Sequence, residues 1–375
     1  MSISFARTDT SLLGRWWWTI DRWTLGAIML IAALGIVLTM AASPAVAERI
    51  GLDPFYFARH QAAYMPMALV VMLLTSLLSP KGVLRIAAIM LLISFSATVA
   101  TLFVGAEVKG ATRWLYLGGT SVQPSEFLKP AFAVVSAALI ARSRVSEAMA
   151  GYPLTAVLLC AVAAVLVLQP DVGTTMLVCA VWSLQIFLVG CPLALIALIG
   201  LLFLGVGVGA YFMFEHVRMR IDQFLDPASS EGFQVKRGIE AFHSGGLFGR
   251  GPGEGHVKEV LPDAHADFIF AVAGEEFGLF LCLLLVCLFG FVVLRGFVRA
   301  FKDSHVFVLL AAGALLALFG MQALMNMAST MRLIPPKGIT LPFISYGGSA
   351  TIALAWTLGM VLALTRDRPD PGGRR

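Results

Sequence analysis

The sequence predicts an all-α polytopic membrane protein with about ten transmembrane helices and one large extracytoplasmic loop between spans seven and eight. Of the 375 residues, 59% are hydrophobic and 13% are charged, whereas soluble domains carry about 25% charged residues. Because each span needs roughly 20 apolar residues, the chain has room for about ten. The composition therefore excludes a soluble domain held by a single anchor.

Ten apolar segments can be drawn along the chain. The first follows Arg22 and continues for about twenty residues without a small-residue cleavage pattern, which is typical of a retained span rather than a signal peptide. The segments are 23–43, 61–79, 86–105, 124–141, 153–169, 172–190, 193–214, 268–294, 306–325 and 349–365.

The distribution of lysine and arginine predicts the orientation. An even number of spans places both termini on one side, and positive residues gather in both tails and in the short connections on that side. The positive-inside rule makes that side cytoplasmic. We therefore expect a cytoplasmic tail at 1–22, a transmembrane domain at 23–365 with a periplasmic loop at 215–267, and a cytoplasmic tail at 366–375.

The opposite face also carries cations in short segments, against this trend. They are Lys109, Arg113, Arg332 and Lys337. Such a face favours an anionic ligand at the outer membrane surface, for example a diphosphate. On charge alone, contact with ordinary lipid headgroups is an equally good explanation.

A polar loop gives way to an apolar run at residues 261–276, LPDAHADFIFAVAGEE. A carboxylate where a loop enters a bilayer is costly unless it faces protein or water, which makes it a functional candidate. We favour Asp267 as a catalytic base. The competing interpretation is a helix N-cap, in which an aspartate before an apolar run accepts backbone N–H bonds.

A second charged group opens the fourth span. Glu126 and Lys129 are three residues apart, so they share one face of a helix. They form either a structural ion pair or the wall of a substrate pocket, and spacing favours the structural pair. Trp114, beside Arg113, could stack on a sugar, although a place in the aromatic belt is commoner.

Other residues with chemical potential give weaker signals. The glycine-rich residues 249–255 could form a flexible loop that offers N–H groups to phosphate, and Asp171 in QPDVG is explained by turn chemistry. The five cysteines lie in or beside apolar runs, and the histidines are scattered. We therefore expect neither a disulfide framework nor a zinc site.

Together, several motifs resemble the signature stretches of the SEDS family (shape, elongation, division and sporulation), in the family's order over roughly residues 20–366. They are KGATRW, QPSEFLK, QPDVGTT, LPDAHADFIFAVAGEEFG and PPKGITLPFISYGGS. The resemblance, strongest to the septal branch, implies a ten-helix glycosyltransferase that polymerises lipid II into β-1,4 glycan strands of peptidoglycan. It implies that Asp267 is catalytic. It also implies substrate-binding roles for Glu126, Lys129, Trp114 and Lys337. We add Arg113, Ser345 and His265 as further candidates for substrate binding.

The resemblance further implies partners and a location. The partners are a class B penicillin-binding protein, which cross-links the strands, and other divisome proteins, with no nucleic acid. The location is the bacterial inner membrane at the division septum. No cofactor is required by the sequence, although Mg²⁺ or Mn²⁺ could bind the diphosphate.

A competing interpretation from another class is a transporter that flips lipid II across the membrane. Ten spans and the intramembrane pair Glu126 and Lys129 would suit it too. A transporter needs polar groups through the depth of the bilayer, whereas here they cluster toward the outer third. That clustering favours chemistry at the surface.

Overall fold

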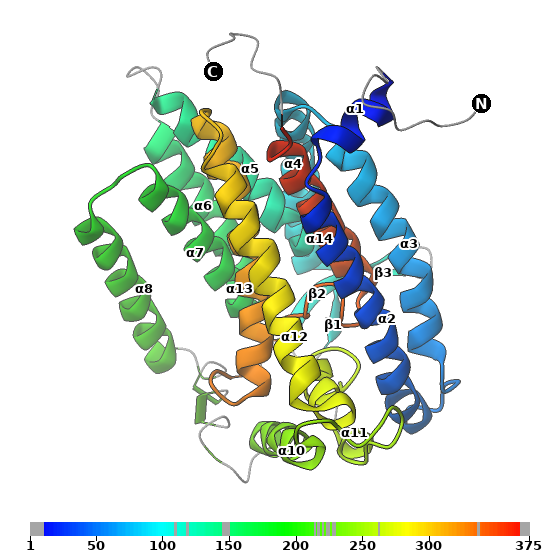
Figure 1. Ribbon diagram of the computed structural model, residues 1–375. Helices are drawn as coiled ribbons and strands as arrows, with labels where there is room; N and C mark the ends of the chain where they lie inside the picture. Colours follow the sequence, from blue (N-terminus) through cyan, green and yellow to red (C-terminus); the bar gives the residue numbers. More distant parts are fainter. Residues whose placement is uncertain are drawn as a thin grey trace.

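The computed structural model describes residues 11–108, 111–117, 120–144, 151–213, 215, 218–219, 221–222, 226, 230–261, 263–335 and 338–367. Its long helices form a bundle (Figure 1). They are α2 (Arg22–Arg49), α3 (Tyr56–Ser76), α4 (Pro80–Val104), α5 (Pro124–Ser143), α6 (Gly151–Leu168), α7 (Val172–Leu188), α8 (Leu193–Met213), α12 (Ile269–Ala300), α13 (Val306–Thr330) and α14 (Gly348–Leu364). Each coincides with one of the ten apolar segments, so the prediction of a polytopic helical fold is confirmed.

Within the described residues, six helices are long and apolar enough to cross a membrane: α2, α4, α5, α6, α12 and α13. The helices α7 and α14 are apolar but shorter. Lipid offers backbone groups no hydrogen-bond partner, so an apolar run must satisfy them within itself as a helix.

The core of the bundle is formed by α5, α13 and α14. Almost every side chain of α14 is buried, and α14 packs most extensively on α3. Gly359 permits this contact, because a β-carbon there would stand 2.7 Å from the carbonyl oxygen of Met72. Small residues allow such close backbone approach between membrane helices.

The connection between α4 and α5 is a small antiparallel sheet, which the sequence did not predict. Its strands are β1 (Ala106–Val108), β2 (Ala111–Leu117) and β3 (Thr120–Val122), in the order β1-β2-β3. Ala106 pairs with Trp114, and Leu115 pairs with Val122. The sheet thereby fixes the position of Arg113 and Trp114 on β2.

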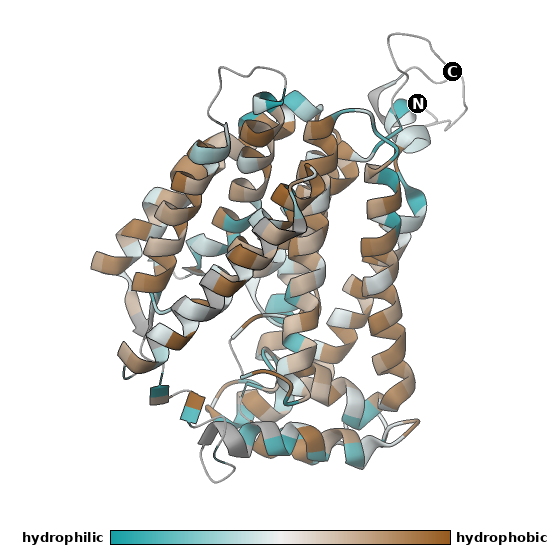
Figure 2. Ribbon diagram, turned by 90° about the vertical axis from the view of Figure 1, so that its left-hand side faces the viewer, coloured by the Kyte–Doolittle hydropathy of each residue, from teal (hydrophilic) through white to brown (hydrophobic). Residues whose placement is uncertain are grey.

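The two ends of the bundle differ. The helix α1 (Leu12–Thr19) and the last turn of α14 lie at one end, whereas α10 (Ser230–Gly245) and α11 (Val257–Val260) cover the other (Figure 1). Hydrophobic residues cover the lengths of the helices, and hydrophilic residues gather toward the ends and on α10 (Figure 2). Residues 233–242 are part of α10, which packs against α12.

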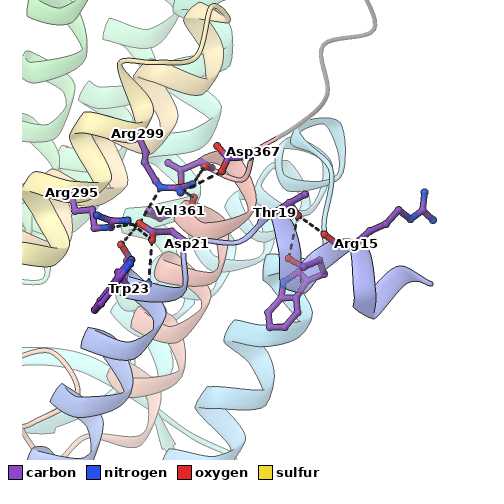
Figure 3. Close-up of polar contacts among 11 residues, drawn as sticks. Arg15, Thr19, Asp21, Trp23, Arg295, Arg299, Val361 and Asp367 are labelled. Carbon is purple, nitrogen blue, oxygen red and sulfur yellow. Dashed lines mark hydrogen bonds and ion pairs between the residues drawn. The ribbon is translucent and has the colours of Figure 1, made fainter. Parts of the chain in front are cut away.

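An ion-pair cluster joins the chain termini to α12 (Figure 3). Asp21, which caps α2, accepts two hydrogen bonds from Arg295 at 2.6 and 3.0 Å. Arg299 lies 3.1 Å from the same carboxylate and 3.4 Å from that of Asp367. The N–H of Asp367 donates to the carbonyl oxygen of Thr19 at 3.0 Å. This end of α12 is therefore fixed to both α2 and the segment after α14.

The other end of α12 contains a break. Gly278 has φ 76° and ψ −173°, a conformation open almost only to glycine. The carbonyl groups of Glu275 and Glu276 instead accept N–H bonds from Arg250 and Gly251, each at 3.0 Å. Beyond the break, α12 donates two N–H bonds to the same loop at 3.0 and 3.3 Å. The loop thus satisfies the backbone groups that the break exposes.

Candidate active site

The Asp267 turn, residues 263–268, lies between α11 and α12. Asp263 adopts φ 53° there, and its carbonyl oxygen accepts the N–H groups of Ala266 at 2.9 Å and Phe268 at 3.4 Å. The N-cap of α12 is Phe268, one residue after Asp267. Asp267 is therefore not the N-cap residue itself, and its half-buried side chain belongs to the turn.

Two elements, α13 and the loop before α14, hold this turn in place. The Asn326 side chain on α13 donates to the carbonyl oxygen of Asp267 at 3.0 Å and to that of Ile339 at 2.7 Å. The Ser345 hydroxyl donates to the carbonyl oxygen of Ala266 at 2.6 Å. These bonds fix the turn against the final loop, residues 338–347, so that the two segments form one unit.

The Asp267 carboxylate is close to the start of this final loop. Its Oδ2 atom lies 3.9 Å from the point where a β-carbon on Gly338 would stand. Lys337, predicted to bind substrate, immediately precedes Gly338 but lies outside the described residues. Its role in binding substrate therefore stays a prediction.

The pair Glu126 and Lys129 is buried within α5, as its spacing predicts. Lys129 Nζ donates to Glu126 Oε1 at 2.8 Å and to the side chain of Gln322 at 3.3 Å. Gln322 in turn donates to the hydroxyl and carbonyl oxygens of Thr340 at 3.3 and 3.4 Å. The charged pair is therefore connected to the final loop, which also holds the Asp267 turn.

Sequence reasoning missed Gln322 and Asn326. Both are 1% exposed, and they lie one helical turn apart on α13. The signal was present, because two amides four residues apart share a helix face and are costly inside an apolar span without partners. Their side chains connect the Glu126–Lys129 pair, the final loop and the Asp267 turn.

Arg113 is bonded to another part of the bundle. Its guanidinium donates to the carbonyl oxygens of Gln169 and Pro170 and lies 3.6 Å from Asp171 Oδ1. Asp171 also caps α7 by accepting the N–H of Thr174 at 3.2 Å. Turn chemistry thus accounts for Asp171, and Arg113 supports that turn.

Two other predicted binding residues support the Asp267 turn. The His265 ring is buried and stacks on Phe57 of α3, with centroids 4.0 Å apart. The backbone carbonyl oxygen of His265 accepts the N–H of Tyr346 at 2.9 Å. Ser345 accepts the N–H of Leu341 at 2.7 Å while donating to the turn. Trp114, on β2, is half-buried.

Two buried carboxylates hold the loop before the turn. The Glu275 carboxylate accepts the backbone N–H groups of residues 256–258 at 2.8, 2.8 and 3.1 Å. Glu276 accepts the N–H of Gly253 at 3.0 Å and pairs with Lys258. The N–H groups of Arg250, Gly251 and Gly253 are thus bonded to α12. They do not form the flexible phosphate loop that the glycine content suggested.

Within the described part of the chain, no group of three or more histidine, cysteine, aspartate or glutamate side chains could hold a metal ion. The candidate site is the half-buried carboxylate of Asp267, which lies at the α10 end of the bundle beside the final loop.

Fold and site together define a polytopic helical membrane protein whose polar site lies at one end of the bundle, beside a broken helix. The chain belongs to the FtsW, RodA and SpoVE family of cell cycle proteins, whose model matches residues 22–369. The family resemblance of the motifs is thereby confirmed.

Individual relatives support this assignment. The chain is 45% identical over 372 residues to a probable peptidoglycan glycosyltransferase FtsW of Caulobacter vibrioides, covering 99% of this chain and 95% of the relative. It is 33% identical over 360 residues to the protein of that name from an Escherichia coli O6:H1 strain, covering 92% of this chain and 85% of the relative.

Solved structures share the fold. A chain from a study of polymerization and crosslinking by a peptidoglycan synthase complex matches with a TM-score of 0.78 and 27% identity, covering 92% of this chain and 97% of that one. The rod shape determining protein RodA of Thermus thermophilus matches with a TM-score of 0.66 and 25% identity, covering 93% and 97%.

Proposed function

We propose that this protein is a peptidoglycan glycosyltransferase that polymerises lipid II into β-1,4 glycan strands during septal wall synthesis, with Asp267 as its general base. The observation that carries the role of Asp267 is its position. Its carboxylate is half-buried outside the helix cap, in a turn fixed to the final loop by Asn326 and Ser345.

The reaction requires a base. Asp267 removes the proton from the 4-hydroxyl of the N-acetylglucosamine of one lipid II as that oxygen attacks the anomeric carbon of the N-acetylmuramic acid of another. The new bond replaces the bond to undecaprenyl diphosphate, with inversion at the anomeric carbon. A positioned general base typically contributes about 10²–10⁴-fold to the rate.

The leaving diphosphate requires compensating charge. Lys337 would supply part of this charge, because it precedes Gly338 in the sequence and Gly338 lies close to the Asp267 carboxylate. Lys129 would contribute through the final loop, to which Gln322 connects it. Fixed cations stabilise charge that develops in a transition state. Mg²⁺ or Mn²⁺ bound to diphosphate oxygens would assist, with substrate supplying most of the ligands.

The setting follows from the same proposal. The protein spans the bacterial inner membrane at the septum, both termini are cytoplasmic, and the α10 end faces the periplasm. The charge distribution of the tails supports this orientation. Its partner is a class B penicillin-binding protein of the divisome, which cross-links the glycan strands that the glycosyltransferase makes.

The test uses purified Asp267→Asn protein together with its penicillin-binding partner. We expect glycan polymerisation to fall by about 10²–10⁴-fold while lipid II binding persists. Asp53→Asn removes an exposed carboxylate paired with Arg59 and is the matched control, with polymerisation expected near the wild-type level. Near-normal polymerisation by Asp267→Asn would rule out the base role.

A second arm of this test separates polymerase from transporter. Vesicles containing the reconstituted protein and fluorescent lipid II are scored for glycan chains and for translocation. Glycan chains without translocation support the proposal, and translocation without chains overturns it in favour of a flippase.

A further inference from the structure

A row of aromatic side chains lies on one face of α3. Tyr56, His60 and Tyr64 are spaced by four residues, so they follow one another along the helix. Their ring centroids are 4.2 Å apart between Tyr56 and His60, and 6.4 Å apart between His60 and Tyr64. The row extends about 12 Å along the axis, at about 1.5 Å per residue. All three side chains are half-buried.

Tyr346 of the final loop approaches the same row. Burial, together with the neighbouring phenols of Tyr64 and Tyr56, raises the pKa of Tyr346 to about 12. The Tyr64 ring also packs on the first turn of α14, since a β-carbon on Gly348 would lie 2.8 Å from its Cζ atom. Phenols from α3 and the final loop are therefore close to one another.

This aromatic surface, defined as Tyr56, His60, Tyr64 and Tyr346, adjoins the Asp267 turn. The N–H of Tyr346 donates to the carbonyl oxygen of His265, two residues before Asp267. The rings of His265 and Tyr346 are 5.5 Å apart. A molecule on the aromatic surface would therefore lie next to the candidate base.

The polar atoms of these side chains make few hydrogen bonds within the described part of the chain. In the part of the chain that the structure describes, the hydroxyl groups of Tyr56, Tyr64 and Tyr346 make no hydrogen bond, and His60 uses only Nδ1, which lies 2.8 Å from the carbonyl oxygen of Tyr56. Half-buried hydroxyls without protein partners are available to a ligand.

We propose that the aromatic surface binds the saccharide of the glycan strand, a neutral oligosaccharide of N-acetylated amino sugars. A pyranose ring presents C–H groups that pack on aromatic faces, and its hydroxyl and amide groups match phenol and imidazole tips. The four side chains that define the surface carry no fixed charge, so they suit the sugar rather than the diphosphate. This inference rests on the proposed function, because a glycan strand is that reaction's product.

The experiment uses a lipid-free N-acetylglucosamine–N-acetylmuramic acid tetrasaccharide, titrated into the full-length protein in detergent and followed by saturation-transfer NMR. We expect saturable binding to the wild type, weakened about tenfold in His60→Leu and in Tyr64→Leu, as loss of one good aromatic contact implies. Tyr64→Phe keeps the ring against Gly348 and reports the hydroxyl alone. Thermal unfolding of each variant verifies folding.

The matched control is Tyr211→Phe, which removes a phenol hydroxyl bonded to Asp222 at the end of α8, away from α3 (Figure 1). Its saccharide affinity should equal that of the wild type. Asp267→Asn should also bind the tetrasaccharide normally, which separates this site from the catalytic proposal. Absence of wild-type binding, or equal binding by folded His60→Leu and Tyr64→Leu proteins, overturns the inference.

Discussion

Replacing Glu275 with alanine should loosen the loop that precedes the Asp267 turn. This carboxylate is fully buried and accepts three backbone N–H groups, those of residues 256–258. The accepted groups lie at the start of α11, where a negative charge is favourable. Alanine would remove all three acceptors and leave the loop bonded to α12 mainly through Glu276 and the helix break.

The magnitude follows from the burial of each bond. A buried donor left without an acceptor costs about 1–3 kcal/mol. Only the bond to the Lys258 N–H is fully buried, whereas the other two lie where water can replace the carboxylate in part. We therefore expect about 3 kcal/mol in total, which corresponds to roughly a hundredfold increase in local opening.

Amide hydrogen exchange measured by mass spectrometry tests this value. Protection of the peptide containing residues 256–258 should fall by about a hundredfold in Glu275→Ala, and polymerisation should fall with it. Glu275→Gln should lie between the wild type and alanine, because its amide oxygen can still accept the N–H groups of His256 and Val257 whereas its N–H₂ group would face the N–H of Lys258. Glu254→Gln, an exposed acid of the same loop, should change neither. Unchanged protection in Glu275→Ala would refute the reasoning.

Three further outcomes are expected. Lys129→Met should destabilise the protein by about 3–5 kcal/mol, because it leaves Glu126 buried and unpaired. In the double variant with Glu126→Gln, the thermal midpoint should return to the wild-type value. Polymerisation should stay low in that double variant if Lys129 stabilises the leaving group. Burial favours a higher pKa for Asp21, but the hydrogen bond from Arg295 and nearby charges outweigh it and lower the pKa below 3.8. The stability that Asp21 contributes is therefore complete above that value, so the difference in thermal midpoint between wild type and Asp21→Asn should be constant at neutral pH and shrink below about pH 4. Gly278→Ala should lower the thermal midpoint strongly, since its φ of 76° with ψ −173° costs other residues about 1–3 kcal/mol.

The helices were predictable because lipid leaves an apolar run of this length one hydrogen-bonded option. Each of the ten apolar segments is a helix, with ends that differ by a few residues. The strands β1–β3 were not predictable by the same reasoning. Their residues carry no long alternating pattern, and their pairing depends on where α4 ends and α5 begins.

The site was predicted only in part. The spacing of Glu126 and Lys129 places them on one helix face, and that pair is present. The hydrogen bonds from Lys129 through Gln322 to Thr340 join residues far apart in the sequence. No local sequence pattern therefore predicts them. Glu275 and Glu276 also look like ordinary helix acids, because their partners are backbone groups of a distant loop.

The break at Gly278 determines which elements position Asp267. Since the carbonyls of Glu275 and Glu276 bond to the loop, residues 269–277 join the layer formed by α10 and that loop. The rest of α12 is fixed at the opposite end by Asp21, through Arg295 and Arg299 (Figure 3). The loop is also bonded to α12 beyond the break, through the N–H groups of Leu279 and Phe280. The position of Asp267 therefore depends on the loop and on both parts of α12 together.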